Sequence, residues 1–162
     1  MEIRSKIVNR SSEAFDVIYR ESDPLIDVQG KILQGVHAYC FYKDRFVVVY
    51  TESKKYWTPP GGGIEEGESY EEATIREVLE ETNMKVLKQR LIGYQDVYES
   101  DRISRQTRSF CLVEPIGRFV SDPDGDITKI KLIKPEKYKE YFDWGEIGDH
   151  IMNRALEIKD AF

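Results

Sequence analysis

Cysteine is scarce in this sequence of 162 residues, which holds only Cys40 and Cys111. Both lie inside apolar runs, where a free thiol behaves as a small hydrophobic side chain. Two such residues form neither a disulfide framework nor a Cys-x-x-Cys metal site, which suits a reducing compartment. The first residues, MEIRSKIVNRSSE, lack the apolar segment of a signal peptide, and no stretch approaches the roughly 18 apolar residues of a membrane span. We therefore expect a cytoplasmic protein with no membrane partner.

Positive charge is also in short supply. The chain has 24 basic and 30 acidic residues, a formal net charge of −6 and a pI near 5.1. This balance excludes the broadly basic surface with which proteins bind polymeric nucleic acid. The acid is concentrated, because residues 65–81 hold eight glutamates and one base, Arg76, while the rest of the chain is close to neutral. The length and the 40% share of apolar residues predict a single folded domain over 1–162.

Apolar periodicity predicts both strands and helices. Strand-like runs occupy 14–20, 35–42, 45–52, about 86–97, 107–115 and 127–133. Helical spacing predicts helices over 71–82 and about 143–159. Proline and glycine mark 54–63 as a loop. This order of elements predicts an α/β fold, in which a mixed sheet is flanked by helices.

The helix predicted over 71–82 begins at a capping box formed by Ser69 and Glu72. Rotation by about 100° per residue separates an apolar, core-facing side from a charged side. The apolar side holds Ile75, Val78, Leu79 and Thr82, and the charged side holds Arg76, Glu77, Glu80 and Glu81. Glu77 and Glu81 repel each other at spacing i, i+4. A solvated charged face is one interpretation, and a site for a hard cation such as Mg²⁺ or Mn²⁺ is the other.

The glycines ahead of this helix do not form a phosphate-binding P-loop. That motif requires Gly-x-x-x-x-Gly-Lys-Ser/Thr, and here Glu68 follows Gly67 where the lysine should stand. A site of this charge repels a bare phosphate, so a metal ion is needed between them. The glycine run and the acidic helix together favour the cation site over the solvated face.

Residues 62–84, GGIEEGESYEEATIREVLEETNM, resemble the Nudix box, G-x5-E-x7-R-E-U-x-E-E-x-G-U, where U is a bulky aliphatic residue. The positions in register are Gly62, Glu68, Arg76, Glu77, Val78, Glu80, Glu81 and Met84. Asn83 replaces the last glycine of the pattern. Asparagine is the next-best residue for the left-handed conformation that ends a helix, so we expect the metal-facing side to be intact.

The resemblance implies a Nudix-type α/β/α sandwich with a mixed β-sheet between helices. It implies a hydrolase that cleaves a pyrophosphate bond in a nucleotide, or in a nucleoside diphosphate linked to another moiety. Glu77, Glu80 and Glu81, with a backbone carbonyl near Gly61 or Gly62, would hold Mg²⁺ or Mn²⁺. The implied catalytic residues are Glu77, Glu80 and Arg76, and Arg76 would orient a neighbouring glutamate while paired with Glu68.

Several features of the reaction stay open. The candidates for the general base are Glu77, Glu99, Asp101, Asp122 and Asp124. The small size favours a nucleoside-triphosphate pyrophosphohydrolase, and a homodimer is a further expectation because Nudix domains often dimerise. A non-catalytic nucleotide-sensing module of the same fold is the alternative function. A Nudix-fold isomerase acting on an isoprenoid diphosphate is disfavoured, since its additional Cys and Glu pattern is not seen.

Aromatic and basic residues outside the box are candidates for substrate binding. Tyr56, Trp57, Tyr94 and Tyr98 could each stack on a base or pack in the core. Arg102, Arg105 and Arg108 could clamp phosphate or line a solvated strand edge. We expect Trp57, Arg105 and Tyr98 to bind the substrate. His37 and His150 belong to no ligand cluster, and 122–126 is expected to form a turn and not a calcium loop.

Overall fold

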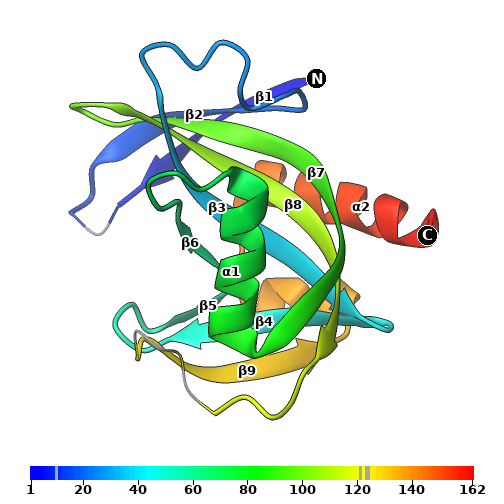
Figure 1. Ribbon diagram of the computed structural model, residues 1–162. Coiled ribbons are helices and arrows are strands. Elements are labelled where there is room, and N and C mark those ends of the chain that lie inside the picture. The colour runs from blue at the N-terminus through cyan, green and yellow to red at the C-terminus, as the bar shows by residue number, and fades with distance from the viewer. Residues whose placement is uncertain (10, 121, 123–124) are drawn as a thin grey trace.

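The computed structural model describes residues 1–9, 11–120, 122 and 125–162 (Figure 1). Nine strands and two α-helices make up the regular structure of these residues. The strands are β1 (Glu2–Val8), β2 (Ala14–Arg20), β3 (Ile32–Tyr42), β4 (Arg45–Thr51), β5 (Tyr56–Thr58), β6 (Gly61–Gly63), β7 (Met84–Tyr98), β8 (Ile103–Pro115) and β9 (Ile127–Ile133). The helices are α1 (Tyr70–Thr82), α2 (Gly145–Asp160) and a short 3₁₀ helix, η1 (Pro135–Glu140).

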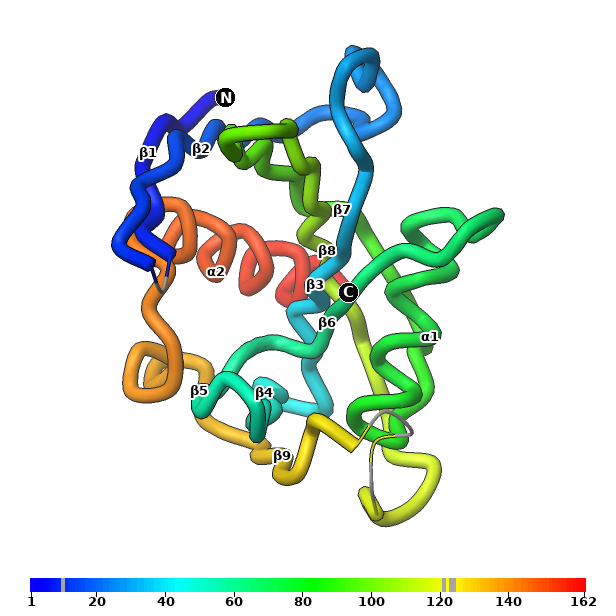
Figure 2. The backbone as a smooth tube through the Cα atoms, turned by 90° about the vertical axis from the view of Figure 1, so that its left-hand side faces the viewer, coloured from blue at the N-terminus to red at the C-terminus, as the bar shows by residue number. Residues whose placement is uncertain are grey.

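All nine strands belong to one mixed sheet. Its order is β1-β2-β7-β8-β3-β4-β5, while β6 pairs with β3 and β9 pairs with β4. β3 and β8 run parallel, and the other pairs are antiparallel. The two helices lie on opposite sides of the strands (Figure 2). The predicted α/β/α sandwich with a mixed sheet is therefore confirmed.

The side of the sheet under α2 carries the larger core. Phe41, Phe46 and Phe110 are fully buried there. Helix α2 packs Ile147, Ile151, Met152, Ala155 and Ile158 onto them. These residues recur at helical spacing, which is why the segment forms an amphipathic helix against this face. The helix predicted from about 143 to 159 is confirmed, with its start two residues later.

The side of the sheet under α1 carries a smaller core made of smaller residues. The cluster consists of Ala38, Cys40, Val47, Val78, Met84, Cys111 and Val113. Cys40 and Cys111 are adjacent in the parallel pairing of β3 and β8 and are free thiols. Their apolar surroundings confirm that each packs as a small hydrophobic side chain.

The face with which α1 packs on the sheet differs from the prediction. Ala73, Thr74, Val78 and Thr82 are buried. Ile75 and Leu79 are 47% and 44% exposed, so the prediction that they belong to the core is wrong. The reason is that the helix turns Glu77 and Glu81 toward β6, where Glu81 accepts a hydrogen bond from Gly61. The carboxylates point into the protein, and two aliphatic side chains point out.

Some elements were missed or misplaced by apolar periodicity. The segment 54–63 is not wholly a loop, because it contains β5 and β6, which pair with β4 and β3. β1 was not predicted, and its side chains are mostly exposed, so it has little apolar signal. β8 begins four residues before its predicted start, in a polar stretch. Within the described part of the chain, neither helix combines the length and apolarity needed to cross a membrane.

Candidate active site

The strand β6 consists of three glycines and lies between β3 and α1. A Cβ atom on Gly62 would lie 2.5 Å from Oε1 of Glu77, so a side chain at this position would displace the carboxylate. The backbone N–H of Gly61 donates to Oε1 of Glu81 at 2.9 Å. The glycine run thereby brings two carboxylates of α1 against the edge of β3.

The ends of α1 are fixed by local hydrogen bonds. At the start, Ser69 and Glu72 form the predicted capping box in both directions. At the end, Asn83 adopts the left-handed conformation with φ of 55°, and its N–H donates to the carbonyl of Leu79. The substitution of asparagine for glycine therefore leaves the helix terminus intact, as predicted.

Arg76 joins the acidic residues into one network. Its guanidinium donates to both carboxylate oxygens of Glu68, at 2.7 Å and 2.9 Å. Nη1 donates to Glu77 at 2.9 Å and to Glu80 at 3.2 Å. Nη2 also donates to the carbonyl of Gly63 at 2.9 Å. Arg76 thus fixes the helix to the glycine strand and orients two of the three clustered glutamates.

The charges of this network are unevenly balanced. Hydrogen bonds from Arg76 hold the pKa of Glu68 low, at about 2. Burial raises the pKa of Glu77 to about 7, because its desolvation and repulsion from Glu80 outweigh the attraction of Arg76. Burial raises the pKa of Glu81 to about 8, with Glu77 and other acids adding to the effect. One arginine does not offset the repulsion among the carboxylates that face β6.

The same carboxylates are the candidate ligands for a divalent cation. Among the residues that the structure describes, no group of three or more Asp, Glu, His or Cys side chains lies close enough together to coordinate a metal ion. Arg76 Nη1 instead lies between Glu77 and Glu80. The donor set nevertheless fits a hard cation, since it offers carboxylate oxygens on successive turns of one helix, and burial opposes their ionisation without a counter-charge.

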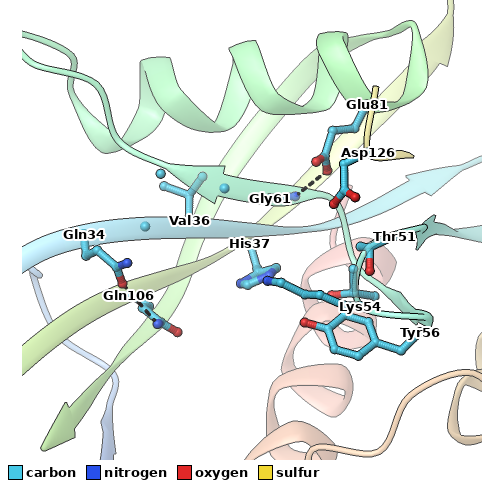
Figure 3. A pocket seen from close by; sticks show the side chains of 14 residues that line it. Gln34, Val36, His37, Thr51, Lys54, Tyr56, Gly61, Glu81, Gln106 and Asp126 are labelled. Carbon is cyan, nitrogen blue, oxygen red and sulfur yellow. Dashed lines mark hydrogen bonds between the residues drawn. The ribbon is translucent and has the colours of Figure 1, made fainter. Parts of the chain in front are cut away.

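A cavity of about 290 Å³ opens beside Glu81 and the glycine strand (Figure 3). Its acidic side holds Glu81 and Asp126, and Lys54 faces them across the cavity. Apart from the glycines of β6, its other lining residues come from β3, β4, β5 and β8, namely Gln34, Gly35, Val36, His37, Thr51, Tyr56, Thr58 and Gln106. The arrangement suits an anionic ligand held next to a carboxylate cluster through a cation.

Trp57, predicted to bind the substrate, lies near this cavity in β5. Its ring packs edge-on against Tyr141 at 5.6 Å and lies 5.3 Å from the ring of Tyr50. It also lines a neighbouring cavity of about 310 Å³, together with His37 and Trp144. The structure therefore places Trp57 within the region of the site, and its contact with substrate stays a prediction.

Arg105, also predicted to bind the substrate, is fully buried. Nε and Nη2 donate to the two carboxylate oxygens of Asp96 at 2.8 Å and 3.0 Å. Its remaining N–H groups donate to the carbonyls of Pro24, Ile26 and Asp27 in the β2–β3 loop. All five N–H groups are thus engaged within the protein. The prediction of a phosphate clamp is wrong, because Arg105 fastens a loop to the sheet.

Tyr98 is separated from the acidic cluster. It lines a different cavity, of about 470 Å³, with residues of β1 and β2 such as Arg4 and Asp16. Tyr94 is buried beneath the guanidinium of Arg105, which lies 4.1 Å from the ring centre. Neither tyrosine faces the carboxylates of α1, so the expectation that Tyr98 binds substrate there is not met.

The candidates for the general base fall in different places. Glu77 lies in the cluster, and Asp122 contributes to raising its pKa. Glu99 accepts hydrogen bonds from Arg102 and Ser104 at the β7–β8 turn, and Asp101 lies in the same turn. Asp124 lies outside the described residues. Glu77 and Asp122 therefore lie near the site, whereas Glu99 and Asp101 lie in the β7–β8 turn, outside it.

Several residues of the cavity were missed from the sequence. His37, expected in a core or surface role, lines three adjoining cavities. Burial and the nearby cations Arg108 and Lys54 hold its pKa well below the ordinary value. Gln106 and Trp144 also lie at this junction. Only the position of His37 in the fold identifies it, because His37 pairs with Gly61 across β3 and β6 and the sequence does not show that pairing.

The fold and the site define an α/β/α protein in which the acidic side of α1 packs against a glycine strand beside a polar cavity. The family model of the NUDIX domain matches residues 33–154, well over half of the chain. The chain therefore belongs to the NUDIX family and is a hydrolase of that family.

Solved structures share the fold at low sequence identity. A mutant of the Bacillus subtilis pyrophosphohydrolase BsRppH has 18% identity and a TM-score of 0.74, over 94% of this chain and 96% of that one. The MutT protein of Bacillus halodurans has 21% identity and a TM-score of 0.57, over 75% and 80%. An Ap4A hydrolase of C. elegans has 18% identity and a TM-score of 0.57, over 79% and 99%.

Proposed function

We propose that this protein is a divalent-metal-dependent hydrolase that cleaves a pyrophosphate bond in a nucleotide, or in a nucleoside diphosphate linked to another moiety. The nucleoside-triphosphate pyrophosphohydrolase type is favoured. The supporting observation is that Glu77, Glu80 and Glu81 gather on one side of α1, against a glycine strand and beside a polar cavity. The proposed ligand is a small nucleotide. The proposed location is the cytoplasm, and the proposed oligomeric state is a homodimer.

The proposed ligands of the metal are the carboxylates of Glu77, Glu80 and Glu81 with the carbonyl of Gly61, and Mg²⁺ or Mn²⁺ is the proposed ion. Such an ion neutralises diphosphate charge and acidifies a bound water. Arg76 orients Glu77 and Glu80, to which it donates hydrogen bonds. Glu68 in turn accepts hydrogen bonds from Nε and Nη2, along one edge of the guanidinium. Lys54 supplies positive charge for the substrate on the opposite wall.

The proposed proton acceptor is a carboxylate on the acidic wall of the cavity. Glu77 is a candidate because burial brings its pKa to about 7, where a general base works best at neutral pH. Asp122 is the other candidate that remains near the cluster. His37 is a weaker one, since its neutral imidazole has a pKa held far below neutrality and faces away from the acidic wall.

The names of similar structures are consistent with this proposal. One is a pyrophosphohydrolase, and another is an Ap4A hydrolase. The first name states the hydrolysis of a pyrophosphate, and the second states the hydrolysis of Ap4A. At their low identity they bring no particular substrate to this chain.

The test is a product screen over nucleoside triphosphates, nucleotide sugars and dinucleoside polyphosphates, with Mg²⁺ and with Mn²⁺. Glu80→Gln and Glu81→Gln are each expected to lower turnover by at least about tenfold, the scale of losing a group that stabilises transition-state charge. Glu71→Gln, in the first turn of the same helix, is the matched control and should retain activity. Full activity in both cluster variants would refute the metal assignment. Tight nucleotide binding without turnover would favour the sensing module instead.

A further inference from the structure

A second, larger cavity adjoins the one beside Glu81. It measures about 550 Å³ and shares His37, Tyr56 and Gln106 with the first cavity. Its other lining residues include Arg108 and Trp144, which lie on the α2 side of the sheet. A ligand with its diphosphate beside Glu81 therefore reaches the second cavity by passing His37. We call this second space the Trp144 cavity.

Two residues that line the Trp144 cavity each carry a buried polar atom without a hydrogen-bond partner among the described residues. The atoms are Nε of Arg108 and Nδ1 of His37. Arg108 is only 2% exposed, and its Nη atoms donate to the carbonyl of Thr107 at 3.0 Å and to Gln106 Oε1 at 3.2 Å. Buried polar groups in proteins are nearly always hydrogen-bonded. An unpartnered guanidinium N–H beside a cavity therefore points to a ligand that accepts a hydrogen bond.

An aromatic wall completes the cavity. The ring of Trp144 is partly exposed and lies edge-on to His37, with centroids 5.2 Å apart and an interplanar angle of 72°. The guanidinium of Arg108 lies over one face of the Trp144 ring, 5.1 Å from its centre. Stacking on an aromatic face holds a nucleobase, and guanidinium reads its edge. The two groups lie close enough to act on the same planar ligand.

A row of amide side chains holds Arg108 in place. Gln95 donates to Gln106 at 3.4 Å, and Gln106 donates to Gln34 at 3.4 Å, so the row crosses β7, β8 and β3. Figure 3 shows the Gln34–Gln106 bond on the wall of the first cavity. Because Gln106 also accepts from Arg108, the row links the wall beside the carboxylates to the donor in the Trp144 cavity.

We propose that the Trp144 cavity binds the nucleobase of the substrate, and that the preferred base is a purine with a carbonyl oxygen at position 6. This inference rests on the proposed function. Trp144 stacks on the base, and Arg108 donates to its carbonyl oxygen and ring nitrogen. Guanine presents two acceptors along that edge, whereas adenine presents an amino donor beside one acceptor. Adenine would place donor against donor in a desolvated site, where an unmatched polar group is costly.

The first experiment measures kcat/KM for GTP, ITP and ATP with Mg²⁺. GTP and ITP are expected to exceed ATP by at least about tenfold, the scale of one matched arginine–purine edge. Trp144→Ala should raise KM for GTP by about tenfold, as expected for a lost stack. Arg108→Met should bring the GTP/ATP ratio close to one. Arg90→Met is the matched control, because Arg90 stacks on Phe162 and is solvent-exposed.

A second measurement separates this inference from the proposed function. Calorimetry without metal compares GMP and AMP, which lack the diphosphate. GMP should bind more tightly than AMP, and Trp144→Ala should weaken GMP binding by about tenfold. Thermal melting establishes that each variant is folded, and Arg108→Lys replaces Arg108→Met if the latter does not fold.

The possible results are distinct. GMP selectivity without turnover of any nucleotide would refute the proposed function and leave the base site standing. Turnover with equal use of GTP and ATP would refute the base assignment alone. Equal binding of GMP and AMP, GMP affinity unchanged in Trp144→Ala, or no GMP binding at about 1 mM would each overturn the inference.

Discussion

The two faces of the sheet differ in what they bury. The face under α2 buries a large aromatic and aliphatic cluster, which includes Phe41, Phe46 and Ile151. The face under α1 buries a small cluster around Cys40 and Cys111 and places carboxylates beside it. Apolar burial stabilises a fold at roughly 25 cal/mol per Å², so the first face contributes more to stability. The second face holds like charges together, which lowers stability and creates a site.

The α1 face itself contains two kinds of buried charge. Strand alternation in β8 places Arg105 on the same face as Cys111, and Arg105 is matched by Asp96. Glu77 is paired with Arg76 and Glu81 accepts only from the backbone N–H of Gly61, and burial together with neighbouring acids raises the pKa of both. The comparison shows that burial alone does not identify a functional charge. A charge that the fold leaves unmatched is the better indicator.

The largest expected effect comes from breaking the matched pair. Arg105→Met leaves Asp96 buried without its bidentate partner and should lower the free energy of unfolding by about 3–5 kcal/mol. Urea denaturation measures the loss, and Arg102→Met, at the exposed β7–β8 turn, should change stability by less than about 1 kcal/mol. KM should be unchanged in the folded fraction. A raised KM with wild-type stability would restore the phosphate clamp expected from the sequence.

A second prediction compares the two helices. Ile151→Ala removes a fully buried side chain from the α2 face and should lower the free energy of unfolding by about 2–5 kcal/mol. Ile75→Ala, on the exposed side of α1, is the matched substitution and should cost less than about 1 kcal/mol. Denaturant titration of both variants is the measurement. Equal losses would mean that Ile75 packs in the core, as its sequence position predicts.

A third prediction concerns the pH dependence of stability without metal. Glu77 and Glu81 have folded-state pKa values of about 7 and about 8, above the ordinary 4.5. The folded chain therefore holds these protons more tightly, and the stability they contribute is present below about pH 4.5 and lost as pH rises through about 7 and 8. The pKa of Glu68 is lowered to about 2, so the stability that Glu68 contributes is lost only as the pH falls toward that value.

Thermal melting in chelator from about pH 6.5 to pH 8.5 measures this decline, because at lower pH the lowered pKa of His37 makes stability rise with pH. Glu81→Gln removes one of the two groups and should flatten the curve, whereas Glu71→Gln should leave it unchanged. Stability that rises with pH over this range in the wild-type protein would contradict the raised pKa values.

Local sequence patterns predicted much of the fold. The capping box at Ser69 and the left-handed Asn83 were predicted because both depend on short-range hydrogen bonds and backbone preferences. The spacing of apolar residues predicted α2, which packs through one continuous face. β6 was not predicted, because three glycines have no strand propensity and are paired only by contact with β3.

The candidate site was predictable only in part. The clustering of Glu77, Glu80 and Glu81 follows from helical spacing. Their orientation does not, because it depends on the close approach of Gly62. Of the side predicted to be apolar, Val78 and Thr82 are buried, whereas Ile75 and Leu79 are exposed. Arg105 and Tyr98 were chosen by residue type, and residue type does not reveal burial or which cavity a side chain lines.

The central claim is that the acidic face of α1 holds a divalent cation. Electron paramagnetic resonance of Mn²⁺, titrated into the protein without nucleotide, tests it most directly. The wild-type protein and Glu71→Gln should bind the ion alike, while Glu80→Gln and Glu81→Gln should each weaken binding by about tenfold or more. Equal Mn²⁺ affinity in all four proteins would contradict the claim.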